Sequence, residues 1–163
     1  MNNNNVAGII ESCKQELADI NAMKKMLGPT SPIMMFLTRY SLIKVCGTIE
    51  LAYKTIVADF CENTQSLQVK NFISNKVRNS SRNPTLGNID RLLLDFDENW
   101  QRDFLAKLKA CADHDKISFS LKSLNAARNE FAHGGNPSIS FENVENYFED
   151  SSKIICILDE VVK

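Results

Sequence analysis

Residues 124–135, which read LNAARNEFAHGG, carry the side chains of this chain that are best suited to chemistry. The segment places Arg128, Asn129 and His133 toward the end of an amphipathic helix that a pair of glycines is expected to stop. A guanidinium binds a phosphate through paired hydrogen bonds, and an imidazole transfers protons near neutral pH. Together these two groups are the minimum set for cleaving an RNA backbone without a metal ion.

Angular spacing separates the polar from the apolar residues of this helix. At about 100° per residue, the apolar residues share the face that is expected to meet the core, whereas Asn125, Asn129 and His133 form a polar stripe. Arg128 falls inside the apolar arc, where an unpaired guanidinium is costly to desolvate. We therefore expect Arg128 to have an anionic partner from a neighbouring helix, a second subunit or a ligand.

Arg128 and His133 diverge by about 140° on an ideal helix. Convergence on one phosphate therefore requires the arginine side chain to bend round and the last turn to loosen at Gly134. His133 lies near the negative end of the helix dipole, which favours the imidazolium form and suits a proton donor. The alternative is structural: an arginine paired with a core carboxylate and a histidine that caps the helix.

Length and charge limit the class of protein. A chain of 163 residues, 44% hydrophobic and 24% charged, has the size and composition of one globular domain. Its formal net charge of -1 excludes binding of nucleic acid through bulk positive charge, so any RNA contact must be local. No acidic residue occurs between Glu62 and Asp90, and that interval contains the candidate RNA-binding residues Lys70, Lys76, Arg78 and Arg82. The alternative is a solvated helix face and loop.

The cysteines and the start of the chain indicate the compartment. Five cysteines, odd in number, widely spaced and mostly flanked by apolar residues, are expected to be reduced thiols. No CxxC pair occurs and the two histidines are far apart, so we expect no metal and no other cofactor. Because no secretory signal opens the chain and no apolar stretch is long enough to span a bilayer, we expect a cytoplasmic protein without membrane contact.

Six glycines and four prolines divide the chain into segments whose apolar residues recur at helical spacing. We predict helices over about 6–27, 32–61, 65–78, 88–111, 118–133 and 141–162. A change of phase near Asp97 divides the fourth region in two, and the second helix is apolar on most of its circumference. The predicted fold class is all-α: a compact bundle of about five to seven helices with a long central second helix.

At residues 128–133, which read RNEFAH, the chain resembles the HEPN superfamily, whose signature is Arg, a polar residue, three further positions and His. The order of the helices is similar too, with a long second helix, a motif helix near the C-terminal end and one closing helix. The RiboL-PSP-like and related nuclease-like branches are the most similar. The resemblance implies that residues 1–163 form a single HEPN-like domain, of which we expect residues 1–5 to be flexible.

The resemblance also implies a function. Many HEPN proteins are metal-independent endoribonucleases, among them toxins and abortive-infection effectors of anti-phage defence. His133 would assist removal of the proton of the ribose 2′-hydroxyl or protonate the leaving 5′-oxygen. Arg128 would bind the scissile phosphate and stabilise its developing charge, and Asn129 would orient the phosphate or His133. The products would carry a 2′,3′-cyclic phosphate and a 5′-hydroxyl. A homodimer with facing motif helices and a cognate antitoxin protein are the implied partners.

The sequence leaves the roles of three further residues undecided. Glu50 lies in the apolar central helix, where the resemblance implies an acidic contact to the motif arginine, but an i, i+4 pair with Lys54 explains it equally well. Asn125 is a supporting candidate on the polar stripe, and His114 is expected to be an exposed loop residue. The alternatives to a ribonuclease are a non-catalytic HEPN-like binding or regulatory module and a helical interaction protein.

Overall fold

The computed structural model of the chain describes residues 1–28, 31–62 and 66–163. Within these ranges the chain forms seven α-helices and one π-helical turn, and no strand. The elements are α1 (Asn4–Leu27), α2 (Pro32–Glu62), α3 (Leu67–Ile73), η1 (Ser74–Arg78), α4 (Leu86–Phe96), α5 (Glu98–Ala110), α6 (His114–Ala132) and α7 (Phe141–Val161). The predicted all-α bundle is confirmed.

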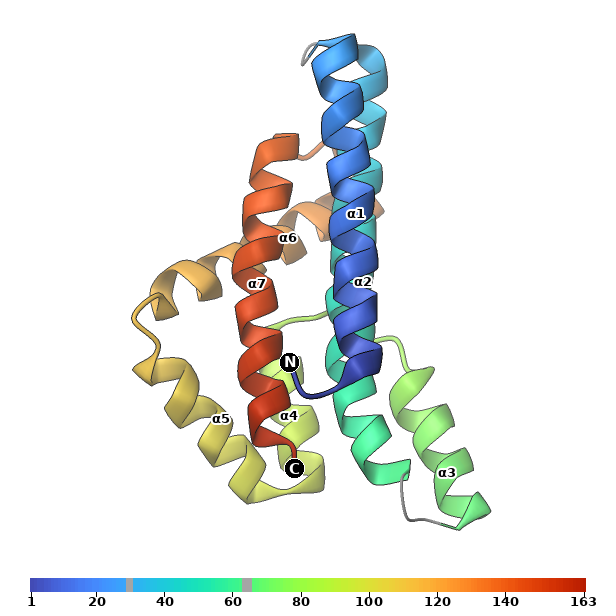
Figure 1. Cartoon of the computed structure of the whole chain (residues 1–163), viewed down its shortest axis with the longest axis vertical. Coiled ribbons are helices and arrows are strands. Elements are labelled where there is room, and N and C mark those ends of the chain that lie inside the picture. Colours follow the sequence, from blue (N-terminus) through green and yellow to red (C-terminus); the bar gives the residue numbers. More distant parts are fainter. Residues whose placement is uncertain (29–30, 63–65) are drawn as a thin grey trace.

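The helices are arranged around α2. α1, α2 and α7 run side by side along the long axis of the molecule, and α6 crosses behind α7 to contact α2 (Figure 1). α4 and α5 form a helical hairpin at the lower end, and α3 with η1 covers the end of α2. Residues 52–58 of α2 are all buried, because helices approach this helix from several sides. The predicted central position of the second helix is therefore confirmed.

The N-terminal residues are bonded to the rest of the bundle. α1 begins at Asn4 because the side chain of Asn3 accepts a hydrogen bond from the backbone N–H of Val6 at 3.0 Å, as an N-cap does. Asn3 also donates from its backbone N–H to Asp159 at 3.1 Å and from its side chain to Asp59 at 2.9 Å. Residues 1–5, for which we expect flexibility, thus include the first two residues of α1 and make contacts to α2 and α7.

The predicted break at Asp97 separates α4 from α5. Asp97 has extended backbone angles, and its carboxylate accepts from the backbone N–H of Asn99 at 2.6 Å to cap α5. α6, in contrast, begins four residues before the predicted start. His114 is therefore the first residue of a helix and not a loop residue, and its ring lies 3.0 Å from the Asp115 carboxylate. The earlier start follows from Ile117, which is fully buried and draws the first turn into the core.

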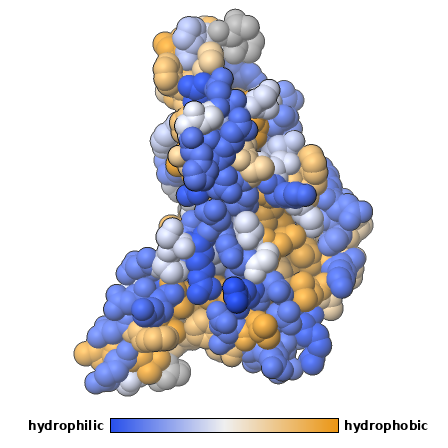
Figure 2. Space-filling view, turned by 180° about the vertical axis from the view of Figure 1, so that it is seen from behind, coloured by the Kyte–Doolittle hydropathy of each residue, from blue (hydrophilic) through white to orange (hydrophobic). Residues whose placement is uncertain are grey.

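Apolar side chains also remain on the surface. Exposed apolar residues lie at the free end of the α1–α2 hairpin, at the top of Figure 2, and on α3, at its lower left. On α2 they recur every three or four residues, at Ile33, Phe36, Tyr40 and Ile43, and Phe36 is 67% exposed. We call these four residues the α2 stripe. None of the described helices is both long and apolar enough to cross a bilayer.

A buried carboxylate joins α6 to α7. Asp150 of α7 accepts a hydrogen bond from the hydroxyl of Ser120 at 2.8 Å and pairs with the ammonium of Lys116 at 2.9 Å. Burial raises the pKa of Asp150, but the bonds from Lys116 and Ser120 outweigh it, so the pKa lies below its usual value. The ionised carboxylate therefore stabilises the packing of α6 on α7.

We expect Asp150→Asn to lower the free energy of unfolding by about 2 kcal/mol at pH 7, because a hydrogen-bonded charge is removed. The wild-type contribution is full above the unfolded carboxyl pKa of about 3.9 and is lost as pH falls through the lower folded pKa. The difference between wild type and variant should therefore shrink below about pH 4. Urea unfolding at several pH values measures this, with Glu149→Gln, an exposed neighbour, as the control. Equal effects of the two substitutions would contradict the prediction.

Candidate active site

The guanidinium of Arg128 is half-buried between α6 and the loop of residues 79–85. Its Nη1 donates to the side-chain oxygen of Asn83 at 2.8 Å and to that of Asn129 at 3.3 Å. The side-chain amide of Asn83 in turn donates to the Asn129 oxygen at 3.2 Å. Among the described residues no carboxylate lies within ion-pair distance of Arg128, so the anionic partner that we expected is not supplied by this part of the chain. The positive charge is oriented by neutral amides only.

The 79–85 loop owes its position to α2. The buried ammonium of Lys54 pairs with the Glu50 carboxylate at 2.8 Å and donates to the backbone oxygen of Ser80 at 2.5 Å. Glu50 also accepts from the backbone N–H of Arg82 at 3.0 Å, and the hydroxyl of Tyr53 donates to the backbone oxygen of Arg82 at 3.1 Å. Glu50 therefore makes the i, i+4 pair with Lys54, and its influence on Arg128 runs through the loop.

Two more helices bond to the backbone of the loop. Asn125 of α6 is buried, and its side-chain amide donates to the backbone oxygen of Pro84 at 2.9 Å and to that of Leu121 at 2.8 Å. Asn88 of α4 donates from its side chain to the backbone oxygen of Asn83 at 2.8 Å. The residue before a proline is restricted to extended conformations, which further limits Asn83. Asn83 is thus fixed where its side chain meets Arg128.

His133 lies exposed at the C-cap of α6, where the glycine pair ends the helix as predicted. Gly134 has a φ of +83°, its N–H donates to the backbone oxygen of Phe131 at 3.0 Å, and the N–H of Gly135 donates to that of Glu130 at 2.9 Å. This pair of bonds is a Schellman motif. A Cβ on Gly135 would lie 2.6 Å from a side-chain atom of Glu130, so this position also favours glycine. The imidazole makes no hydrogen bond to any described residue, which leaves it available to a substrate.

Arg128 and His133 share no hydrogen-bond partner among the described residues. α6 stays helical through Ala132, so the last turn does not loosen before His133. The two residues therefore keep their divergence of about 140°, with about 7.5 Å between them along the helix axis. Arg128 is directed to the loop, and His133 lies at the helix end.

A family model described as RiboL-PSP-HEPN matches residues 9–163, which contain every residue of this site. The chain belongs to this family. The HEPN resemblance read from residues 128–133 is therefore confirmed, and the class includes many ribonucleases. No curated protein and no solved structure matches the chain.

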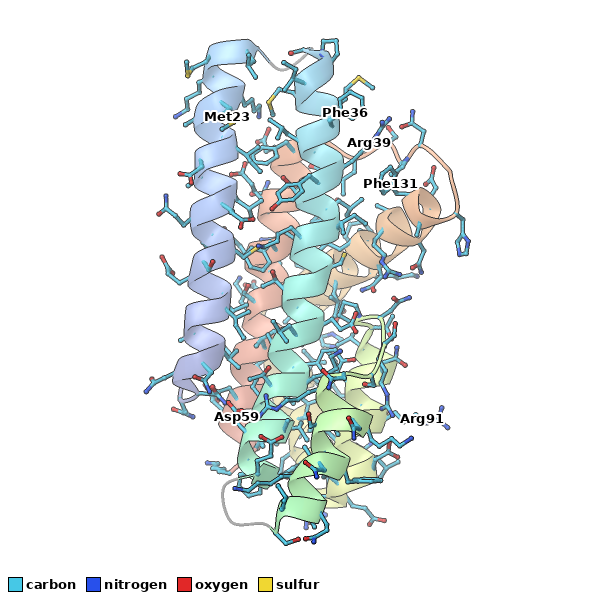
Figure 3. The ribbon with its side chains drawn as sticks, turned by 90° about the vertical axis from the view of Figure 1, so that its right-hand side faces the viewer. Met23, Phe36, Arg39, Asp59, Arg91 and Phe131 are labelled. Atoms are coloured by element: carbon cyan, nitrogen blue, oxygen red, sulfur yellow. The ribbon has the colours of Figure 1, made fainter. Side chains whose placement is uncertain are left out.

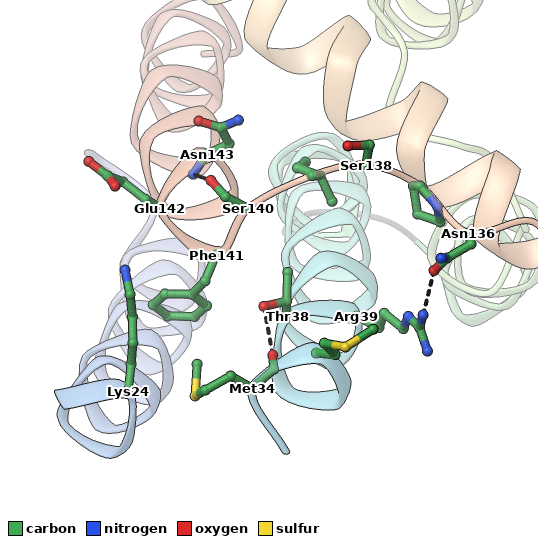
Figure 4. A pocket seen from close by; sticks show the side chains of 13 residues that line it. Lys24, Met34, Thr38, Arg39, Asn136, Ser138, Ser140, Phe141, Glu142 and Asn143 are labelled. Atoms are coloured by element: carbon green, nitrogen blue, oxygen red, sulfur yellow. Dashed lines mark hydrogen bonds between the residues drawn. The ribbon is translucent and has the colours of Figure 1, made fainter. Parts of the chain in front are cut away.

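In this RiboL-PSP-HEPN domain a second arginine bonds to the segment that follows His133. Arg39 of α2 donates to the side-chain oxygen of Asn136, and its guanidinium lies 5.9 Å from the ring centroid of Phe131 (Figures 3 and 4). The Arg39–Asn136 contact borders a cavity of about 660 Å³ between the α1–α2 hairpin and the start of α7. Arg39 thus ties the chain on both sides of His133 to α2. Its neighbours in the sequence carry no motif that would have predicted this contact.

The four basic residues that we predicted to bind RNA lie in different parts of the RiboL-PSP-HEPN domain. Arg78 is bonded to Asp59 and, at 2.8 Å, to Glu62, and the bond to Glu62 raises the pKa of Arg78 more than burial lowers it. Lys70 and Lys76 are exposed on α3 and η1, which pack on α2, whereas Arg82 is next to Asn83 in the loop. Of the four basic residues, only Arg82 belongs to the loop that meets Arg128.

A cysteine close to Arg128 is held in its neutral form. Cys46 of α2 donates from its thiol to the backbone oxygen of Leu124 at 3.6 Å. Burial raises the pKa of the Cys46 thiol to about 12, although the charge of Arg128 acts in the opposite direction. Since the thiolate is the reactive form, Cys46 does not act as a nucleophile in this domain.

Proposed function

We propose that this chain is a metal-independent endoribonuclease of the HEPN type. The observation that carries the proposal is Arg128, a half-buried guanidinium that has only amide partners among the described residues and lies five positions before an exposed histidine. An unpaired guanidinium in such a position favours an anion as its ligand. The phosphodiester of RNA is the anion that the family context favours.

The proposed reaction needs no co-reactant. The ribose 2′-oxygen attacks the adjacent phosphorus, and the bond from phosphorus to the 5′-oxygen breaks. The 2′-hydroxyl proton passes to a base, and an acid donates a proton to the leaving 5′-oxygen. His133 fills one of these two roles, and Arg128, oriented by Asn129, stabilises the charge that develops on the phosphate. The products end in a 2′,3′-cyclic phosphate and a 5′-hydroxyl.

The proposed active form is a homodimer. Two facing α6 helices would provide two copies each of Arg128 and His133, so that acid, base and phosphate contact come from separate side chains. The α2 stripe supports association of the chain with a second copy, because contiguous exposed apolar residues mark interaction surfaces. Sedimentation of the purified chain over a range of concentrations measures the association, and a monomer that cleaves RNA would contradict it.

The proposed cellular role is that of a toxin or anti-phage effector, with a cognate antitoxin protein as partner and the cytoplasm as its place of action. An enzyme that cuts RNA with its own side chains is active without a cofactor. A second protein that inhibits it, such as an antitoxin, would therefore control its activity. Expression of the chain alone is therefore expected to slow growth, and co-expression of a neighbouring antitoxin to restore it.

The test of the proposed activity uses purified protein and single-stranded RNA in the presence of EDTA. We expect fragments with 2′,3′-cyclic phosphate and 5′-hydroxyl ends. An RNA with one 2′-deoxy nucleotide should stay intact at that linkage only, because the internal nucleophile is absent there. Cleavage that continues at the 2′-deoxy linkage, or that EDTA abolishes, would contradict the mechanism. RNA binding without cleavage would favour the non-catalytic HEPN-like module.

A further inference from the structure

A polar cavity of about 500 Å³ is lined in part by Asn83, which also accepts a hydrogen bond from Arg128. Its walls come from the 79–85 loop and from the outer face of α4. They consist of Ser81, Arg82, Asn83, Asn88, Arg91 and Asp95. Two arginines and one aspartate give this lining a net positive charge, although the chain as a whole has a net charge of -1.

The two guanidinium groups of this cavity are available to a ligand. Arg82 approaches the carboxylate of Asp95 only to 3.8 Å, and both side chains are partly exposed, so this pair contributes little to stability. Arg91 is exposed on α4 and points outward on the side of the molecule where Phe131 marks the end of α6 (Figure 3). Arg78, in contrast, forms short ion pairs with Asp59 and Glu62, which hold its guanidinium within the fold.

The cavity is connected directly to the candidate active site. Asn83 contributes to its wall and also accepts from Arg128 at 2.8 Å. The backbone of Arg82 is fixed by Glu50 and Tyr53, so its guanidinium extends from a rigid base. Asn88 bonds to the backbone of Asn83 and so joins α4 to the same loop. One polymer with regularly spaced phosphates can therefore contact Arg128 and this cavity together.

We infer that this cavity binds a phosphate of the RNA strand next to the phosphate held by Arg128. Arg82 and Arg91 provide the charge, and the uncharged side chains of the wall offer hydrogen bonds to phosphate or ribose oxygens. Asp95 opposes binding, because it competes for Arg82 and repels the phosphate. The inference rests on the proposed ribonuclease function, since it assigns a flanking contact of the same substrate.

The binding test uses a fluorescent single-stranded RNA and the His133→Ala protein, which is expected to leave the RNA intact. In that background, Arg82→Gln with Arg91→Gln should weaken binding at least tenfold at low salt. It should also reduce the slope of log affinity against log salt by about 0.7 for each phosphate that the protein no longer neutralises. Asp95→Asn should strengthen binding. Arg102→Gln, which removes one exposed arginine of α5 outside the cavity, is the control for loss of a surface charge and should change affinity less than twofold.

The cleavage test separates a flanking contact from a contact to the scissile phosphate. A dinucleoside monophosphate has one phosphate, whereas an oligonucleotide also fills the flanking site. The Arg82 and Arg91 double variant should therefore lose at least tenfold more activity on the oligonucleotide than on the dinucleotide. Equal losses on both substrates would overturn the inference, because the cavity would then act on the scissile phosphate itself.

The two tests fail in distinguishable ways. If the wild type cleaves no RNA but the double variant still weakens binding, the cavity assignment stands and the proposed activity fails. If the wild type cleaves RNA and the double variant matches Arg102→Gln in affinity, the activity stands and the cavity assignment is overturned. Absence of any RNA binding by the parent protein also overturns it. Thermal unfolding of each variant checks that the loop and α4 remain folded.

Discussion

His133→Ala is expected to lower the rate constant of RNA cleavage by about 10² to 10⁴-fold, the usual contribution of a general acid or base. The imidazole is exposed and bonds to no described residue, so its removal takes away a proton-transfer group and no packing. Single-turnover cleavage at saturating RNA measures the chemical step and excludes a change in affinity as the cause. The melting temperature should shift by no more than a few degrees.

His114→Ala is the matched control for this experiment. His114 is the other histidine of the chain, lies at the opposite end of the same helix and contacts Asp115, so its loss tests the removal of an imidazole from α6 as such. We expect its cleavage rate to remain close to wild type. Equal activity of the wild type and His133→Ala would contradict the catalytic role of His133 and favour a binding or interaction module.

Arg128→Ala is expected to reduce kcat/KM by about 10² to 10³-fold, comparable to the loss of one group that stabilises a developing oxyanion. Arg128→Lys should recover only part of the loss, because an ammonium keeps the charge but lacks the planar pair of donors. The bond between Asn83 and Asn129 does not involve Arg128, so the loop should keep its position in both variants. A full rescue by lysine, or cleavage that persists in Arg128→Ala, would contradict the assigned phosphate contact.

Mixing the two inactive variants tests whether one site uses groups from two chains. A dimer of one His133→Ala chain and one Arg128→Ala chain contains an intact Arg128 on the first and an intact His133 on the second. If the active site combines the two across the interface, the mixed dimer regains up to half of the wild-type activity. If each chain supplies both groups to its own site, or if one site needs both copies of His133 as acid and base, the mixture stays inactive.

Much of the fold follows from local patterns. Helical spacing of apolar residues predicted six segments, and the change of phase at Asp97 separated α4 from α5. The start of α6 was predicted too late, because the residues before Ile117 are polar and their helical state depends on burial of that one side chain. The hydrogen bonds of the N-terminal residues could not be predicted for a similar reason, since the carboxylates that bond them belong to α2 and α7.

Only the part of the candidate site that lies on α6 could be predicted from the sequence. The 128–133 motif is a local pattern, and it identified the family. It also contains the arginine and the histidine that the proposed function uses. Asn83 was missed because it lies 45 residues before Arg128 in a loop without periodicity. Arg39 and Arg91 could not be predicted, because in the sequence each resembles an ordinary surface charge and its neighbours come from other elements of the fold. In the polar loop, the prolyl bond at Pro84 was the one local signal that a backbone conformation is fixed there.

The 79–85 loop is attached to three helices mainly through its main chain. Its bonds to Lys54, Tyr53, Glu50, Asn125 and Asn88 all end on backbone atoms of the loop. The side chains at positions 81 and 82 can therefore be exchanged while the loop keeps its shape. Under the proposed function, the RNA preference of this surface can therefore change while Arg128 and His133 stay the same.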